Sequence, residues 1–245
     1  MFGLRQDRAL VAYLNGYSSI MQLISTAFFI GICIKHGFGR PYKWALNVVM
    51  ISVIAYGAIY FTDWSNATIW VALMVITTVF GLSTGGVYYI PWTVYTFLAD
   101  VDEVMTGRRR EGIYAGAMTF AGKMTRSVIV FLMGWVLSLY GFQSGQATQP
   151  PSAEYAIIGV FTLGVIGLAV LGVIYASQMK LDRKNHVILL EEIERIKAGG
   201  AIADIPAHAR VIAEELTGWK YEQCWGNNPA AKLIQLNKEQ KLKTA

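Results

Sequence analysis

The sequence predicts an all-α integral membrane protein with about five transmembrane helices and a helical cytoplasmic tail. Its 245 residues are 54% hydrophobic and 15% charged, whereas soluble domains carry about 25% charged residues. Residues 69–98 extend for 30 residues without a formal charge, more than the ~20 that a membrane helix needs. Nine of the 16 acidic residues and 11 of the 21 basic ones follow Met179, so much of the charge lies in the tail.

Five apolar runs define the expected spans, and short polar segments separate them. We therefore expect a transmembrane region over residues 1–179 and an amphipathic cytoplasmic tail over residues 180–245. Gly and Pro in the basic segment 35–43 are expected to interrupt helix there. The expected spans are residues 9–34, 44–61, 69–98, 113–140 and 155–176.

The distribution of Lys and Arg predicts the orientation of these spans. Loops 35–43 and 107–112 and the tail are basic, while loops 62–68 and 141–154 contain no Lys or Arg. The positive-inside rule then predicts a multi-pass protein of the cell inner membrane with a cytoplasmic C-terminus. An external Met1 before five spans is what a carrier without its front would show, so a missing N-terminal half is expected. The net charge of +5 follows the same rule and does not indicate nucleic-acid binding.

Polar groups recur along one face of the first span. Asn15, Ser18, Gln22 and Ser25 are spaced by three or four residues, so they share that face. Such a face either joins helices through hydrogen bonds or lines an aqueous path, and the spacing leaves both open.

The fourth span carries two cations inside an apolar run. Thr119, Lys123 and Arg126 lie on one helical stripe, and at 1.5 Å per residue Lys123 is roughly 15 Å from the charged loop, near the bilayer midplane. A charge there marks a transport path by default, and helix–helix pairing is the alternative. No Asp or Glu lies inside the five expected spans. The counter-charge is therefore expected from a substrate, another chain or a part of the protein outside this sequence.

An aromatic stripe runs along the third span. Tyr88, Trp92 and Tyr95 fall at i, i+4 and i+7, and the neighbouring Pro91 is expected to bend the helix. Such a stripe is more often core than binding site, but sugar rings stack on aromatic rings, and their hydroxyls need donors such as Lys123. Three glycines of this span let a neighbouring backbone or a ligand come close: Gly81, Gly85 and Gly86.

A dense charged loop is expected between the third and fourth spans, surrounded by water or lipid headgroups. Ion pairs across it would differ between conformations, and because exposed pairs contribute only about 0–1 kcal/mol each, they suit a gate. Anchoring of the topology by the bases is a compatible alternative. The gate candidates are Asp100, Asp102, Glu103, Arg108, Arg109, Arg110 and Glu111.

The tail is expected to form two short helices, over residues 185–198 and 206–216. Residues 236–245 are expected to be disordered. Three amphipathic rings follow the second of these helices and are able to rest on the inner membrane face: Trp219, Tyr221 and Trp225.

The run DVDEVMTGRRREGIYAGAMTFAGKMTR and the shorter HGFGRPYKW resemble the glycoside–pentoside–hexuronide:cation symporters, the melibiose-carrier family of the major facilitator superfamily. The resemblance covers roughly residues 9–180 and implies helices eight to twelve of a twelve-helix fold. It implies that Lys123 lines the sugar cavity, that Thr119 is a neighbouring polar position and that Trp92 matches a cavity tryptophan. Met118 stands where the melibiose carrier has a glutamine, a departure that bears on which sugar is bound. The family's cation site consists of carboxylates in the first half of the fold.

The resulting prediction is the C-terminal part of a sugar or sugar-acid:cation symporter with alternating access. The substrate-site candidates are Lys123, Thr119, Met118, Trp92, Tyr88 and Arg126. No catalytic residue, metal site or cofactor is predicted beyond a coupling Na⁺ or H⁺ at carboxylates absent from this chain, and the expected partners are the sugar, the lipid bilayer and the missing half. Two alternatives stay open. One is a membrane anchor or regulatory subunit acting through its tail. The other is a membrane enzyme, against which stands the absence of a nucleophile–base pair from the membrane region.

Overall fold

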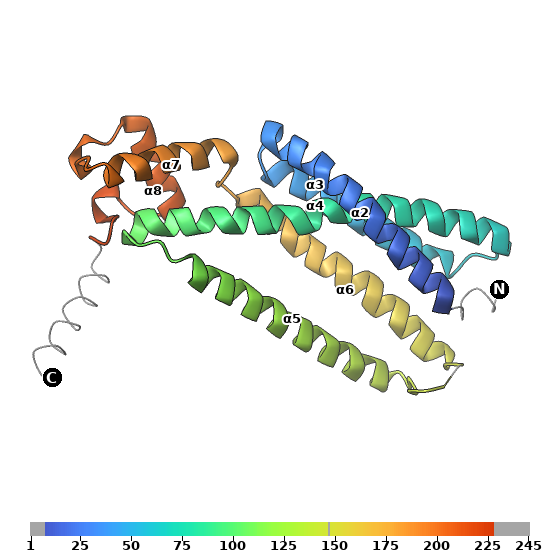
Figure 1. Ribbon diagram of the computed structural model, residues 1–245. Helices are drawn as coiled ribbons and strands as arrows, with labels where there is room; N and C mark the ends of the chain where they lie inside the picture. The colour runs from blue at the N-terminus through green and yellow to red at the C-terminus, as the bar shows by residue number, and fades with distance from the viewer. Residues whose placement is uncertain (1–7, 147, 228–245) are drawn as a thin grey trace, which may run out of the picture. The chain divides into compact units, whose positions relative to one another are not determined.

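The computed structural model describes residues 8–146 and 148–227, and every regular element within these ranges is helical (Figure 1). Five of the helices are long and apolar enough to cross a membrane, which confirms the predicted all-α membrane architecture. The segment 236–245, expected to be disordered, lies outside the described residues. In chain order the elements are α2 (Arg8–His36), α3 (Gly39–Ile59), α4 (Asn66–Thr106), α5 (Glu111–Leu139), α6 (Pro151–Gln178), α7 (Arg183–Lys197), η1 (Ile202–Asp204), α8 (Ala207–Thr217) and η2 (Tyr221–Gln223).

Two connections differ from the expected ones. The basic segment 35–43 is mostly helical, because only two residues separate α2 from α3. Gly37 reverses the chain there with a φ of +73°, and Pro41 lies in the first turn of α3, where a missing N–H removes no helix hydrogen bond. The third span also does not end near residue 98. α4 continues through the acidic residues to Thr106, and Pro91 lies inside this continuous helix.

Contacts divide the described chain into two compact units. The first joins the residues up to Ile90 with Phe120–Met179, and the second joins Pro91–Thr119 with the residues from Lys180 onward. The division at residue 179 expected from the sequence would make the tail a region by itself. The contacts instead group the tail with the end of α4 and the start of α5.

In the first unit, α3 and α6 run antiparallel and pack along most of their lengths. A Cβ atom at Gly39 would lie 3.2 Å from the carbonyl oxygen of Ala176, at the start of α3 and the end of α6. At the opposite ends, the Tyr60 hydroxyl donates a 2.5 Å hydrogen bond to Glu154. Between these points Gly172 accommodates a leucine of α3. Close backbone approach at small residues therefore holds this pair together.

α2 packs against the three glycines of α4. Of the two alternatives predicted for these glycines, a neighbouring backbone or a ligand, the structure shows the neighbouring helix. Ser18 and Ser25 of α2 lie at this packing face, so these two members of the polar face join helices rather than line an open path. The Ser25 hydroxyl donates to a carbonyl of its own helix at 3.1 Å. A Cβ atom at Gly81 would lie 2.8 Å from the Ser18 oxygen, one at Gly86 would lie 2.6 Å from the Phe29 ring, and one at Gly85 would overlap the Ser25 hydroxyl.

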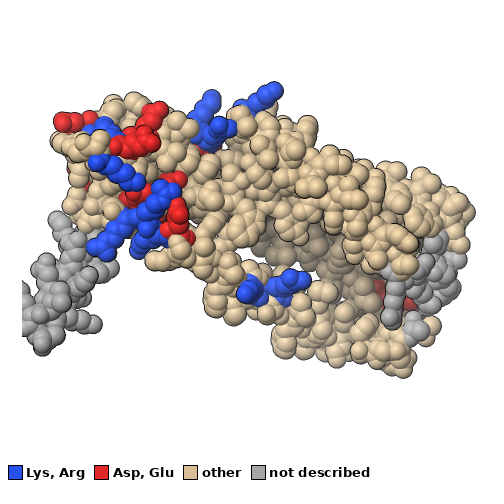
Figure 2. Space-filling model, in the orientation of Figure 1, with Lys and Arg blue, Asp and Glu red and all other residues tan. Residues whose placement is uncertain are grey.

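Large apolar side chains of the first unit point outward. Leu23, Phe131 and Leu163 are more than 70% exposed, and these faces meet lipid or further helices once the chain is in a membrane. On the face shown in Figure 2, charged side chains gather over the tail helices and the adjoining helix ends, and most of the remaining surface is uncharged.

The second unit has an apolar core of its own, which the tail and the end of α4 build together. Asp182 caps the start of α7, and its side chain accepts a 2.9 Å hydrogen bond from the Asn185 amide. Gly218 caps the end of α8 with a φ of +71°. The predicted placement on the membrane face is wrong for Tyr221, which is fully buried. Trp219 and Trp225 are half-buried and pack against the same core. The buried core residues are Val101, Val104, Leu181, Leu189, Ile193, Ala213, Tyr221 and Cys224.

Candidate functional site

The three acids of the predicted gate lie on the last turns of α4, and they are buried. Asp100 is 6% exposed, Asp102 3% and Glu103 5%. The expectation that water or headgroups surround the whole charged group is therefore wrong for its acidic part, because the tail covers these turns. A carboxylate taken out of water needs cationic or hydrogen-bonding partners, and the second unit provides both.

Arg110 is the partner of Asp102. Its Nε and Nη2 atoms donate to the two carboxylate oxygens at 2.8 and 2.5 Å, the two-pronged geometry in which arginine binds a carboxylate most firmly. This pair confirms that the basic triplet and the acids before it interact. Arg108 makes no ion pair with any described residue, and its carbonyl accepts a hydrogen bond from Thr106.

Arg109 lies among three carboxylates. Its short contacts go to Glu111 at the start of α5, with Nε at 2.6 Å and Nη2 at 2.5 Å, and this hydrogen bond raises the pKa of the Arg109 guanidinium. The guanidinium also approaches Asp100 at 3.6 Å and Glu103 at 3.7 Å. It is half exposed, so it can move more easily than the acids that it faces.

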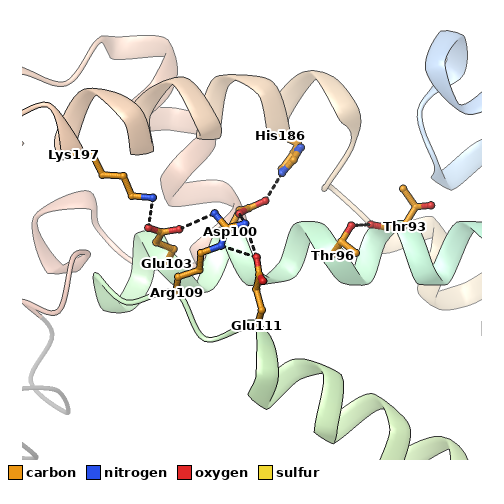
Figure 3. A network of polar contacts seen from close by, with 8 residues as sticks. All are labelled: Thr93, Thr96, Asp100, Glu103, Arg109, Glu111, His186 and Lys197. Carbon is orange, nitrogen blue, oxygen red and sulfur yellow. Dashed lines mark hydrogen bonds and ion pairs between the residues drawn. The ribbon is translucent and has the colours of Figure 1, made fainter.

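Two tail residues complete the site, and the sequence analysis missed both (Figure 3). Nε2 of His186 lies 2.7 Å from Asp100, and Nζ of Lys197 lies 2.7 Å from Glu103. The His186 ring also stacks on Phe97 of α4, with the ring centroids 3.7 Å apart. Both residues come from α7, far from the acids in the sequence. The segment 100–112 contains more acidic than basic residues. This excess was the one sequence signal that the acids need further partners.

The tail also binds the backbone at the end of α4. The Trp225 amide donates to the carbonyl of Val104 at 2.7 Å, and the Gly226 amide donates to that of Met105 at 3.1 Å. The last carbonyls of a helix lack partners within the helix, so the tail satisfies two of them. Gly107, with a φ of +67°, passes close to the Trp225 carbonyl. These contacts attach the tail to the same turns that carry the acids.

A second buried carboxylate stabilises the tail itself. Burial of Glu192 opposes its ionisation, but hydrogen bonds from Arg195 and Tyr221 outweigh this effect and lower its pKa below the ordinary value of 4.5. Both bonds from Arg195 measure 2.8 Å. Burial, and then the hydrogen bond to Glu192, raise the pKa of Tyr221 to about 12. The Trp225 indole donates to the Tyr221 hydroxyl at 2.9 Å, which links this network to the end of α4.

The predicted sugar-contacting stripe lies on α5. Thr119, Lys123 and Arg126 are exposed and Met118 is half-buried, and no described residue of α5 is buried. Neither cation makes an ion pair with a described carboxylate. The structure thus leaves both without a counter-charge in the part of the chain that it describes.

The aromatic stripe of α4 is not a core of the described residues. Tyr88 is 61% exposed and Trp92 55% exposed, and the Trp92 ring meets the Tyr95 ring edge to face with the centroids 6.1 Å apart. In the second unit, a cavity of about 460 Å³ lies between α4 and the start of α5, and Tyr95 and Glu111 line it. In residues 8–146 and 148–227, no group of three or more His, Cys, Asp or Glu could hold a metal ion.

Comparison with known proteins decides the class of this molecule. The model of a family described as MFS/sugar transport protein matches residues 3–183, which is most of the chain. The chain belongs to this family. The major facilitator prediction is thus confirmed, and as a member of a transporter family the protein is a carrier component rather than an enzyme.

Two curated relatives of this transporter chain are uncharacterised symporters. One, sll1374 of Synechocystis, is 36% identical over 93 residues, which are 36% of this chain and 17% of the relative. The other, YnaJ of Bacillus subtilis, is 26% identical over 159 residues, which are 65% of this chain and 34% of the relative. The match therefore spans about one third of the length of YnaJ and less of the other. No solved structure matches the chain.

Proposed function

We propose that the membrane helices α2 to α6 are the C-terminal part of a sugar:cation symporter that works by alternating access. The match of residues 3–183 to the sugar-transport family carries this proposal, and the names of the two relatives support coupled transport. Carriers of this kind move one bundle against another around a site at the membrane midplane. The charged segment 100–112 is the proposed cytoplasmic gate, in an inner membrane with the C-terminus in the cytoplasm.

Lys123 and Thr119 are the proposed sugar contacts on α5, with Met118 and Arg126 on either side of them. A charge in a membrane helix is costly unless it serves a path or a partner, and Lys123 has no carboxylate partner among the described residues. Its ammonium and the Thr119 hydroxyl donate to sugar hydroxyls or to the carboxylate of a sugar acid. A glycoside, pentoside or hexuronide fits this chemistry.

Trp92 and Tyr88 are the proposed stacking platform on α4. Both rings are more than half exposed, so they are free to meet a ligand or a further helix. Aromatic rings bind the apolar face of a sugar, and hydrogen-bond donors bind its hydroxyls. The stripe of α4 supplies the rings, and the stripe of α5 supplies the donors.

The coupling ion, Na⁺ or H⁺, is proposed to bind outside this chain. Carboxylates inside membrane segments mark ion pathways and proton relays. Residues 8–98 contain one acid, Asp63, which is exposed in a connection, and Glu154 accepts a hydrogen bond from Tyr60. We therefore assign the ion site to another part of the carrier, which is the proposed partner of this chain.

Uptake into membrane vesicles tests the proposal. Vesicles from cells that produce the chain together with the proposed remaining part of the carrier should accumulate at least one labelled glycoside, pentose or hexuronate when a Na⁺ or H⁺ gradient is imposed. Lys123→Met should lower this uptake by at least about tenfold, the effect of removing a charged hydrogen bond to a substrate. Lys35→Met removes an exposed lysine at the end of α2 and should leave uptake nearly unchanged. Uptake that is equal in vesicles without the chain, or that survives Lys123→Met, would refute the proposed site.

A further inference from the structure

Asp100 and Glu103 each lie between side chains of two segments, the loop before α5 and helix α7 (Figure 3). Arg109 approaches both acids from the loop before α5. α7 approaches them from the tail, with His186 at Asp100 and Lys197 at Glu103. All five side chains belong to the second unit, so their geometry is that of one compact body.

The tail holds the acids more closely than Arg109 does. His186 and Lys197 both make contacts of 2.7 Å, whereas the two Arg109 distances of 3.6 and 3.7 Å exceed hydrogen-bond length. The oxygens that face Arg109 are Oδ1 of Asp100 and Oε2 of Glu103. Both are buried and accept no hydrogen bond from any residue in the described part of the chain. A donor is therefore favoured at each of them.

Arg109 has the reach to be that donor. A shift of roughly 1 Å would bring its guanidinium within hydrogen-bond distance of both oxygens, and five N–H groups are available to it. Its short contacts in this structure go instead to Glu111, which is exposed.

Closer binding by one side weakens the other, because the cations repel each other. Arg109 and Lys197 carry the same charge and bind the same carboxylate of Glu103, and in a partly buried site this repulsion is larger than in water. The cluster thus has two arrangements available to it. In one, α7 holds the acids and Arg109 pairs with Glu111; in the other, Arg109 closes onto both acids.

We propose that α7 and Arg109 compete for Asp100 and Glu103, so that the tail is a latch on the loop between α4 and α5. This structure has the latch closed. Release of the tail frees the two acids for Arg109 and draws the loop 107–110 onto the end of α4. The regulatory meaning of the latch rests on the proposed function, since this loop is the proposed gate, whereas the competition itself is independent of transport.

Hydrogen–deuterium exchange on the full chain tests the competition. The Trp225 and Gly226 amides, which bond to the end of α4, report whether the latch is closed. Lys197→Met removes a tail cation from a half-exposed position and should speed exchange in this segment by about two- to five-fold. Arg109→Met removes the competitor and should slow exchange there by a similar factor.

Lys180→Met is the matched control, because Lys180 pairs with Glu215 within the tail and touches none of the gate acids. It should leave the exchange of Trp225 and Gly226 unchanged. In the Lys197→Met chain, exchange over residues 107–113 should slow, because Arg109 then closes onto the acids. Faster exchange of Trp225 in Arg109→Met would mean that the charges form one cooperative cluster, and the latch would be refuted. Since no sugar is needed, a failure of the uptake assay leaves this result intact.

Discussion

At the scale of single residues, buried carboxylates decide the chemistry of the second unit. Asp100, Asp102, Glu103 and Glu192 are each at most 6% exposed, and each one has a cation or a hydrogen-bond donor close by. A buried charge without such a partner destabilises a fold by several kcal/mol. The partners on α7 and in the loop before α5 are therefore what allows an apolar helix to end in acids.

The Glu192 network predicts how tail packing depends on pH. The pKa of Glu192 is lower in the folded tail than its ordinary value of 4.5, so its contribution is present above pH 4.5 and is lost as the pH falls through the folded pKa. The pKa of Tyr221 is raised from 10 to about 12, so its contribution is present below pH 10 and is lost as the pH rises toward 12. The unfolding temperature of the tail, monitored through the exchange of the Trp225 amide, should be constant between these two pH limits.

Two substitutions separate the acidic and the alkaline limb of this dependence of tail stability on pH. Glu192→Gln should flatten the acidic limb and Tyr221→Phe the alkaline limb, because each removes one titrating group. Glu191→Gln is the control, since Glu191 is the exposed neighbour of Glu192 and should leave the profile unchanged. An acidic limb that persists in Glu192→Gln would assign it to another carboxylate and contradict the prediction.

At the scale of elements, small residues set how closely the membrane helices approach. α2 packs on α4 at three glycines, and α3 packs on α6 at glycines near both helix ends. Helices in lipid gain little from the hydrophobic effect, so van der Waals contact between backbones supplies the attraction. Large side chains are correspondingly left on the outward faces.

Gly85→Ala is predicted to loosen the pair α2–α4. The new Cβ would overlap the Ser25 hydroxyl and lie 2.8 Å from the Gln22 carbonyl oxygen, and overpacking of this kind costs about 1–3 kcal/mol. We expect the thermal midpoint of the purified chain to fall by several degrees. Gly31→Ala is the matched control, because a Cβ at Gly31 meets nothing within 4 Å and alanine favours helix. Equal midpoints for the two variants would refute the observed packing of α2 on α4.

At the scale of the whole molecule, the five apolar helices and the distribution of Lys and Arg define a proposed topology. The connection between α3 and α4 contains Asp63 and no base, and the tail carries most of the remaining charge. The positive-inside rule assigns the first to the outside and the second to the cytoplasm.

Cysteine labelling checks this topology. A membrane-impermeant maleimide should label Asp63→Cys in intact cells and Glu191→Cys only in inverted vesicles, because both positions are exposed. The unchanged chain is the control: Cys33 and Cys224 are buried, and burial raises the pKa of the Cys224 thiol, so the background should be low. Labelling of Glu191→Cys in intact cells would reverse the proposed orientation.

The helices could be predicted from the sequence more completely than the site could. Membrane helices and the two tail helices could be predicted, because run length and periodicity are properties of neighbouring residues. The interaction of Arg110 with the acids before it could also be predicted, since only eight positions separate it from Asp102. His186 lies 86 positions from Asp100, and no local pattern relates the two.

The resemblance of two motifs to a known family indicated a transporter. The amino-acid sequence alone determined that this is a membrane chain of about five helices with cations in an otherwise apolar span. Composition and helical spacing express those properties directly. Tertiary structure decided that the acids at the end of α4 are buried beneath α7, that Tyr221 lies in a core rather than on a membrane, and that α2 fills the glycines of α4. Each of these depends on which distant segments the folded chain brings together, because a buried charge or a small residue acquires its role only from the neighbour that packs against it.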